Sequence, residues 1–279
     1  MVYFIAEIGI NHNGDINICK DLIRKSKESG ADYVKIQKRN PDVCVPEHQK
    51  DKRKNTPWGE MSYLEYKKKI EFNEDQISEL FEFSKQLEIK FFASVWDKDS
   101  VDLMSKYTSL GKIPSALIND LELCEYARKH FKTLIISTGM STEEEIESCI
   151  NACEPDVIMH TNSTYPCPAE DLNLRYIEHL KDKYSTGTGI DIGYSGHEQE
   201  LETTYASVAL GARWVERHIT LSRDMWGSDQ SCSIEIDEMS KLIKGIRNVA
   251  KAIKYPPGER IQFEKEDEKR KTLRKKIFF

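Results

Sequence analysis

Two histidines in this 279-residue chain, His197 and His218, each stand at the end of a short apolar run, and the two runs follow one another along the chain. Two imidazoles with a carboxylate such as Glu7 can hold Mn²⁺, or alternatively Mg²⁺ or Co²⁺, and leave positions open for water or substrate. Either histidine alone would more often be a hydrogen-bonded, half-buried side chain. The prediction of a divalent metal site therefore depends on the pair.

Two lysines, Lys35 and Lys112, lie within otherwise apolar runs, where a lysine is rarely buried without a partner. Hydroxyl side chains stand in similar places: Ser94, Ser115, Ser137 and Ser195. Ammonium and hydroxyl groups together can hold a phosphate and a carboxylate side by side. The structural alternative is that the lysines extend to a solvated rim and the serines fill space. The set as a whole predicts an anion pocket.

Lys35 also allows a different chemistry, because a desolvated lysine can form a Schiff base with a carbonyl substrate. An aldolase of that type is the strongest rival interpretation. The second lysine and the histidine pair favour anion binding with a metal over the aldolase. More polar residues close the same set of runs: Gln37, Ser163, Tyr165 and Glu216.

The runs that carry these residues are short and apolar, as buried strands are. There are eight of them: 3–10, 33–38, 90–96, 112–117, 134–139, 157–163, 190–196 and 214–220. Side chains two apart on a strand share a face. Eight such strands alternating with helices predict an α/β fold, a (β/α)8 TIM barrel. The polar clusters at the C-terminal ends of the strands would then form the active site at that end of the barrel.

Amphipathic segments with helical spacing separate the apolar runs. They are expected at 15–29, 73–87, 99–107, 120–130, 142–153, 172–184, 200–210 and 236–253. The clearest start is a capping box, with Ser141 or Thr142 followed by Glu144 or Glu145. Regular alternation of strand and helix indicates parallel strands with right-handed crossovers.

The expected domain organisation is one barrel over residues 1–255 with one long insert, 39–72, after the second strand. The insert is rich in charge and, in a barrel, would face the mouth as a lid or a subunit contact. A Pro-Pro-Gly break leads into a charged tail, 256–279, too short for another domain.

The bulk composition excludes several classes of partner and compartment. A net charge of −6 argues against a nucleic-acid surface. No stretch is long and apolar enough to cross a bilayer, and the first apolar run is interrupted by Glu7, unlike a signal sequence. Seven cysteines without paired CxxC spacing are expected to be thiols in a reducing compartment, which predicts a cytoplasmic protein.

Several strings resemble the sialic acid (N-acetylneuraminate) synthases: FIAEIGINHNG at 4–14, GADYVKIQ at 30–37, STGM at 137–140, Tyr165-Pro166 and ERH at 216–218. The resemblance extends to about residue 255, with the motifs in the same order. It implies a transferase that condenses phosphoenolpyruvate with a sugar aldehyde to a 3-deoxy-2-ulosonic acid and phosphate. Water would attack C2 of phosphoenolpyruvate while C3 adds to the metal-polarised aldehyde.

The resemblance also implies roles for individual residues. Glu7 would manage the attacking water, with Gln37 nearby, and His197 and His218 would ligate the metal. Tyr165, Glu216 and Asp229 would border the sugar. The phosphate and carboxylate of phosphoenolpyruvate would be held by Lys35, Ser94, Lys112, Ser115, Ser137, Ser163 and Ser195.

The chain departs from the family pattern where the acceptor would bind. The family's C-terminal antifreeze-like domain, which brings an arginine across a dimer, is expected to be absent, and Arg39 or Arg53 of the insert are candidates to replace that arginine. At 227–230 this chain has Gly-Ser-Asp-Gln, where the family usually has Gly-Pro-Asp-His. The acceptor is therefore left open among N-acetylmannosamine and related sugars, and a homodimer is left open as the assembly. A non-catalytic barrel that binds phosphoenolpyruvate or a sugar is the second rival.

Overall fold

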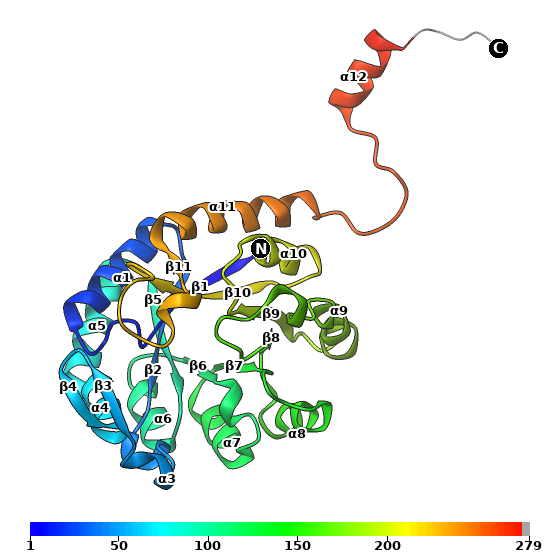
Figure 1. Cartoon of the computed structure of the whole chain (residues 1–279). Helices are drawn as coiled ribbons and strands as arrows, with labels where there is room; N and C mark the ends of the chain where they lie inside the picture. The colour runs from blue at the N-terminus through cyan, green and yellow to red at the C-terminus, as the bar shows by residue number, and fades with distance from the viewer. Residues whose placement is uncertain (275–279) are drawn as a thin grey trace.

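The computed structural model describes residues 1–274, and its centre is a closed barrel of parallel strands (Figure 1). Neighbouring strands follow chain order, and the first closes on the last, with Glu7 opposite His218. The predicted (β/α)8 barrel is confirmed. Its eight strands are β1 (Tyr3–Gly9), β2 (Tyr33–Lys38), β5 (Lys90–Val95), β6 (Leu110–Ile113), β7 (Thr133–Ser137), β8 (Val157–Thr161), β9 (Asp191–Gly196) and β10 (Trp214–Thr220).

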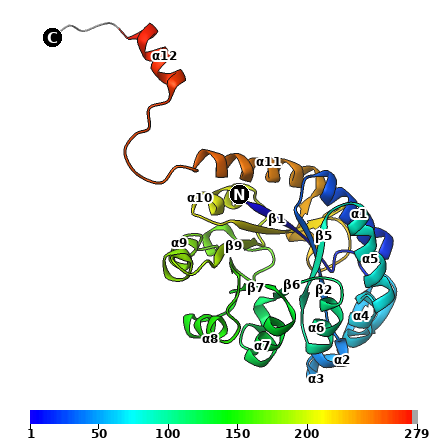
Figure 2. The same ribbon diagram turned by 180° about the vertical axis from the view of Figure 1, so that it is seen from behind.

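Helices surround the barrel and join successive strands, as both views along it show (Figures 1 and 2). The predicted capping box is formed by Thr142 and Glu145 at the start of α8. The surrounding helices are α1 (Ile16–Glu28), α5 (Glu74–Gln86), α6 (Lys98–Ser105), α7 (Leu121–His130), α8 (Glu143–Cys153), α9 (Tyr176–Leu180), α10 (Glu202–Ala209) and α11 (Ile236–Ala252).

Alternation along the strands divides the apolar core into two parts. On β1, Phe4, Ala6 and Ile8 pack outward against the helices, whereas Ile5 packs inside the barrel. Glu7 is two residues beyond Ile5, so the same alternation turns its carboxylate into the barrel. The interior cluster fills the lower barrel and leaves the polar residues above it at the C-terminal ends.

Two predicted elements differ most from the structure in their bounds. The fourth strand ends at Ile113, and Ser115–Leu117 forms a 3-10 turn, because Pro114 has no N–H to continue the ladder. The helix predicted over 172–184 is shorter: Asn173 has a positive φ of 44°, which a helix cannot include. α9 therefore starts at Tyr176 and is followed by a π-helical turn, Lys181–Ser185.

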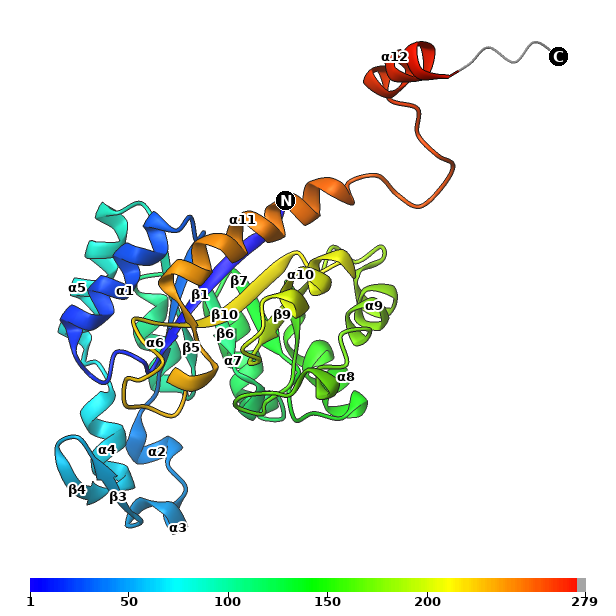
Figure 3. The same ribbon diagram turned by 45° about the horizontal axis from the view of Figure 1, so that its top comes forward.

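The insert after β2 is folded, with two one-turn helices, an antiparallel hairpin and a longer helix. These are α2 (Pro41–Cys44), α3 (Glu47–Lys50), β3 (Arg53–Thr56), β4 (Gly59–Ser62) and α4 (Tyr63–Ile70). Figure 3 shows them together at one end of the barrel. Tyr66 and Ile70 of α4 pack with Ile10 after β1 and with Trp226 after β10, so the insert is attached to the rim where the barrel closes.

The C-terminal segment leaves the barrel after a short strand, β11 (Ile234–Glu235), and α11. Its helix α12 (Glu264–Leu273) stands away from the barrel in Figures 1 and 3 and buries none of its residues. Within residues 1–274, none of the helices has the length and apolar composition to cross a membrane.

Candidate active site

A cavity of about 230 Å³ opens at the C-terminal ends of the strands, and the sequence-predicted site residues gather there. Asp229 alone among them stands outside its lining. The predicted residues that line it are Glu7, Lys35, Gln37, Ser94, Lys112, Ser115, Ser137, Ser163, Tyr165, Ser195, His197, Glu216 and His218.

The floor of this cavity is a network of two lysines and two glutamates. Lys35 Nζ lies 2.6 Å from Glu7 Oε2 and donates to Ser94 Oγ at 2.7 Å. Lys112 Nζ lies 2.7 Å from Glu216 Oε1, which is also 3.7 Å from Lys35 Nζ. No side chain of the four is more than 4% exposed. Buried charges of this kind are stable only when they are paired.

The electrostatics of the floor favour an ionised carboxylate at Glu216. Burial alone would raise the pKa of Glu216, but the ammonium groups of Lys112 and Lys35 outweigh it and lower that pKa to about 2. Burial lowers the pKa of Lys112, and the carboxylate of Glu216 opposes this shift. The two positive and two negative charges cancel, so the floor is charged but close to neutral overall.

A ring of hydroxyls surrounds a glycine on the wall of the cavity. Gly139 N donates to Ser115 Oγ at 3.1 Å. A Cβ at this position would collide with Ser163 Oγ and would lie 2.8 Å from Ser115 Oγ. Only glycine lets both hydroxyls approach the backbone, and backbone approach of this kind is typical of an oxyanion cradle.

Some polar atoms of the cavity have no hydrogen-bond partner within residues 1–274, although they are buried. They include Ser137 Oγ, Glu216 Oε2 and His218 Nδ1. An unpaired buried polar group costs about 1–3 kcal/mol. Three such atoms in one cavity indicate that a polar ligand or water completes the site.

The two histidines stand together at the rim, with ring centroids 5.4 Å apart. His197 Nδ1 lies 2.5 Å from the carbonyl oxygen of Asn162, which leaves Nε2 free. Burial lowers the pKa of His197 to about 3, with the charge of His218 acting in the same direction, so its imidazole is neutral. The ring of Tyr165 lies 4.0 Å from that of His197.

These histidines fit a metal ion that takes its remaining ligands from water or substrate. Neutral imidazoles are the form that ligates metals, and His218 Nδ1 is buried without a hydrogen-bond partner in the described chain. Among residues 1–274, no three histidine, cysteine, aspartate or glutamate side chains converge as a complete metal site. The pair leaves more positions open than the three protein ligands of a typical catalytic zinc site, so water, substrate or a nearby carboxylate would complete the coordination.

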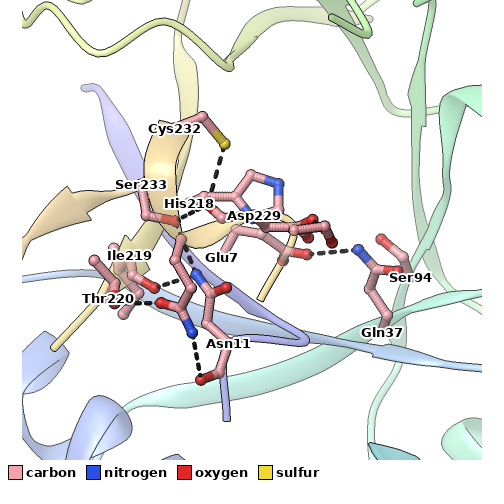
Figure 4. Close-up of polar contacts among 12 residues, drawn as sticks. Glu7, Asn11, Gln37, Ser94, His218, Ile219, Thr220, Asp229, Cys232 and Ser233 are labelled. Atoms are coloured by element: carbon pink, nitrogen blue, oxygen red, sulfur yellow. Dashed lines mark hydrogen bonds and ion pairs between the residues drawn. The ribbon is translucent and has the colours of Figure 1, made fainter. Parts of the chain in front are cut away.

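Asp229 stands beside the cavity, with Oδ2 3.9 Å from His218 Nδ1. Figure 4 shows it next to His218 and Glu7, with Gln37 and Ser94 to the right. Its backbone carbonyl accepts a hydrogen bond from Ser233 Oγ at 2.6 Å. Asn11 in turn donates to Ser233 Oγ at 2.8 Å, so the loop after β10 is held to the loop after β1.

Sequence reasoning missed several parts of the site. Trp96, Met140 and Thr161 also line the cavity. The role of Gly139 follows only from the backbone approach of two serines that are distant in sequence. Glu216 was predicted to border the sugar, and the structure places its carboxylate on the floor with both lysines.

A larger hollow of about 580 Å³ lies at the opposite end of the barrel. It is lined by residues at the starts of strands, among them the packed rings of Tyr3, Tyr33 and Trp214. The buried ion pairs and the histidine pair are at the other mouth. The smaller cavity is therefore the candidate active site.

Comparison with known proteins identifies what this arrangement resembles. The model of the NeuB family matches residues 22–256. An N,N'-diacetyllegionaminic acid synthase of Campylobacter jejuni is 35% identical over 263 residues, covering 89% of this chain and 76% of that protein. The N-acetylneuraminate-9-phosphate synthase of Homo sapiens is 34% identical over 261 residues, covering 91% and 72%.

A solved structure extends the similarity to the fold. The crystal structure of an N-acetylneuraminic acid (sialic acid) synthetase from Leptospira borgpetersenii, in complex with citrate, superposes with a TM-score of 0.86 at 30% identity. The match covers 99% of this chain and 93% of that one.

Proposed function

Because this chain belongs to the NeuB family, whose named members here are sialic acid and legionaminic acid synthases, we propose that it condenses phosphoenolpyruvate with a sugar aldehyde to a nonulosonic acid and phosphate. N-acetylmannosamine or a related amino sugar is the acceptor. The observation that carries the proposal is the pairing of Lys35 and Lys112 with buried carboxylates inside a cavity that also holds unpaired hydroxyls.

The anion chemistry of the cavity supports phosphoenolpyruvate as the donor. Ser115, Ser163 and the backbone at Gly139 form a polar cradle on the wall of the cavity. Lys35 and Lys112 supply charge-assisted donors on the adjacent floor. The phosphate of phosphoenolpyruvate is assigned to the cradle and its carboxylate to the lysines. Each group then accepts hydrogen bonds from donors that the protein already holds in place.

Glu7 is the group suited to handle protons at the reacting carbons. Its Oε2 is paired with Lys35, and its Oε1 lies 3.5 Å from Gln37 Nε2 at the edge of the cavity. A carboxylate in that position can orient a water molecule and accept its proton as the water adds to C2. Gln37 is itself hydrogen-bonded to Arg39, which fixes its amide toward Glu7.

The charge balance of the cavity supports a metal ion at His197 and His218. A phosphate monoester carries close to two negative charges at neutral pH, and phosphoenolpyruvate adds a carboxylate. The floor has no net charge to offset them. A divalent ion on the two histidines would polarise the acceptor's aldehyde oxygen, while the histidine side chains hold it at the rim.

The Schiff-base interpretation is disfavoured by the surroundings of Lys35. Its ammonium group contacts Glu7, Ser94 and Glu216, and an ion-paired ammonium group is not a nucleophile. Borohydride treatment with a carbonyl substrate distinguishes the two chemistries. A covalent adduct on Lys35 would contradict the condensation proposal.

The deciding experiment is phosphate release from phosphoenolpyruvate with Mn²⁺ across a panel of aldoses, with a chelator control. Chelator-sensitive release that requires one sugar would support the proposal and identify the acceptor. If phosphoenolpyruvate raises the melting temperature but no sugar supports release, a non-catalytic barrel that binds phosphoenolpyruvate becomes the better description.

A further inference from the structure

His197 and His218 are held in different ways by the backbone. His218 lies within β10, where Glu7 of β1 is opposite it in the register. β9 and β10 run together until Arg217 lies opposite Gly196, and β9 ends there, so His197 comes one residue beyond its strand. The ladder between strands therefore fixes His218 but not His197, and other contacts must set the distance between the two rings.

Two contacts hold His197 to the loop after β8. Its Nδ1 lies 2.5 Å from the carbonyl oxygen of Asn162, and its own carbonyl oxygen accepts a hydrogen bond from Cys167 N at 3.0 Å. Both partners precede β9 in the chain, so these contacts do not tie His197 to β10. A tie to β10 is supplied through the next residue along, Glu198.

Arg217 of β10 reaches across to the segment that follows His197. Because side chains alternate along a strand, Arg217 points away from the cavity that the residues on either side of it line. Its Nη1 donates to Glu198 Oε1 at 3.1 Å and to the carbonyl oxygen of Glu200 at 3.0 Å, and its Nη2 donates to the carbonyl oxygen of Glu198. One guanidinium group therefore holds three oxygens of the segment just after His197.

The carboxylate of Glu198 is fixed on its other sides as well. It accepts hydrogen bonds from Tyr194 OH at 2.9 Å and from Thr203 Oγ1 of α10 at 2.8 Å. A Cβ on Gly196 would lie 2.5 Å from Glu198 Oε2, so the glycine is what lets this carboxylate fold back over the end of β9. The side chains of Glu198 and Arg217 are both 0% exposed. The pair is a buried joint between β9, β10 and α10.

Stability alone does not explain a buried ion pair of this kind. Apolar side chains of similar volume are often at least as stabilising in such a place, because ions lose their hydration when they are buried. Apolar side chains cannot supply direction, whereas a planar guanidinium group fixes where its hydrogen-bond partners lie. The pair therefore suits a role in holding the segment after β9 at one position relative to β10.

We propose that Arg217, acting through Glu198, is a positioning residue for the histidine pair. It sets where His197 Nε2 stands relative to His218, so that one divalent ion can bind to both rings. The inference rests on the proposed function for the identity of the ion. Arg217 and Glu198 act from outside the cavity, through the placement of the two imidazoles before the ion binds.

Arg217→Lys tests this role with the charge retained, because a lysine cannot reach all three oxygens at once. Electron paramagnetic resonance of free Mn²⁺ is expected to show an affinity at least about tenfold weaker than that of the wild type. The affinity for phosphoenolpyruvate, measured by calorimetry without metal, should change by less than about twofold, because the side chains of the cavity floor are all kept.

Arg247→Lys is the matched control for the loss of a guanidinium group. Arg247 of α11 donates to Asp32 Oδ2 and to the carbonyl oxygen of Gly30, both at 2.9 Å, so it too joins a carboxylate and a backbone oxygen. Asp32 directly precedes β2 and so lies at the end of the barrel opposite the cavity. This variant should keep the Mn²⁺ affinity of the wild type.

The double variant Arg217→Met/Glu198→Gln separates positioning from stability, since it removes both buried charges together. Its melting temperature should lie close to that of the wild type, while its Mn²⁺ affinity should remain weaker by about tenfold or more. Mn²⁺ affinity like that of the wild type, in this variant or in Arg217→Lys, would show that the pair only supports the fold and would overturn the inference.

A measurement without metal keeps the inference separate from the proposed function. The contact of His197 Nδ1 with a carbonyl oxygen places the ring proton on Nδ1, so wild-type protein labelled at histidine should show one neutral tautomer of His197 in long-range ¹H–¹⁵N spectra. Both tautomers should appear in Arg217→Lys but not in Arg247→Lys. Unchanged His197 signals in Arg217→Lys would contradict the inference, even if the wild type bound no Mn²⁺. A failure of phosphate release with every aldose would count against the proposed function alone.

Discussion

Lys112 on β6 and Glu216 on β10 form an ion pair across the interior of the barrel, with Nζ and Oε1 2.7 Å apart. The two strands are not neighbours in the sheet, so the pair spans the cavity floor and is not part of a strand ladder. In the proposed reaction, an anionic donor that enters the cavity would add its own oxygens to a lysine that already has a carboxylate partner. Binding therefore reorganises an existing contact instead of filling a bare positive pocket.

This relationship predicts two separable effects of Lys112→Ala. The change should lower the free energy of unfolding by about 3–5 kcal/mol, because Glu216 is left buried with one partner fewer. It should also abolish the rise in melting temperature that phosphoenolpyruvate gives. The double variant Lys112→Ala/Glu216→Gln should recover stability but not binding. Donor affinity like that of the wild type in Lys112→Ala would remove Lys112 from the anion site.

Gly139→Ala should disable the cradle without unfolding the barrel. The added Cβ would collide with Ser163 Oγ and displace Ser115 Oγ, both flexible hydroxyls that can move aside. We expect phosphoenolpyruvate affinity to fall by about tenfold or more, equal to roughly 1.4 kcal/mol, as measured by calorimetry. Gly258→Ala is the control, since a Cβ there meets nothing within 4 Å. Equal affinities of the two variants would argue against the cradle.

His218→Ala should abolish Mn²⁺ binding, since the histidine pair supplies the only protein ligands of the proposed site among residues 1–274. Electron paramagnetic resonance of free Mn²⁺ measures this directly, without turnover. His179→Ala is the control, because His179 is half-exposed on α9 and contacts Glu143. Unchanged Mn²⁺ affinity in His218→Ala would contradict the metal assignment.

His12 predicts a pH dependence of stability. Its buried ring stacks on Phe72 with centroids 4.2 Å apart, and burial lowers its pKa to about 3 from an ordinary value of 6.5. Between these values the unfolded chain binds a proton that the folded protein does not. Stability from this residue is therefore full above about pH 6.5 and falls by roughly 1.4 kcal/mol per pH unit as the pH decreases toward 3.

Denaturant unfolding of the wild type and His12→Asn between pH 7 and pH 4 measures this contribution. In the wild type, His12 Nδ1 accepts a hydrogen bond from Gly14 N at 3.0 Å. An asparagine side chain keeps an oxygen acceptor near that position but cannot take up a proton. The acid loss of stability should be smaller in the variant. Parallel pH profiles for the two proteins would show that His12 does not titrate in this way.

Much of the architecture was predictable because strands and helices leave local patterns. The barrel, its eight strands and the Thr142–Glu145 capping box follow from apolar spacing and cap residues. The bounds that were wrong depend on single backbone features: Pro114 ends β6 early, and the positive φ of Asn173 delays α9. The hairpin of the insert was not predicted, because its residues are mostly polar and carry no strand alternation.

The candidate site was predictable as a set of residues but not as a set of contacts. Convergence of strand ends placed Lys35, Lys112 and the histidines together correctly. The partner of Lys112 is set by which side chains meet across the barrel, and Glu216 is distant in sequence. The spacing of residues along the chain therefore does not predict the contact between Lys112 and Glu216. The roles of these residues in catalysis, the metal and the division into a barrel at 1–255 and a tail remain predictions.

The closure of β1 on β10 has a consequence for how the protein is made. Synthesis runs from the N-terminus, so Glu7, Lys35 and Lys112 leave the ribosome well before Glu216 and His218. Until the last strand arrives, Lys112 lacks its ion-pair partner Glu216 and the barrel has an open edge. The cavity floor therefore cannot be complete before β10 is made, and a chain whose translation stops before β10 is expected to be inert rather than partly active.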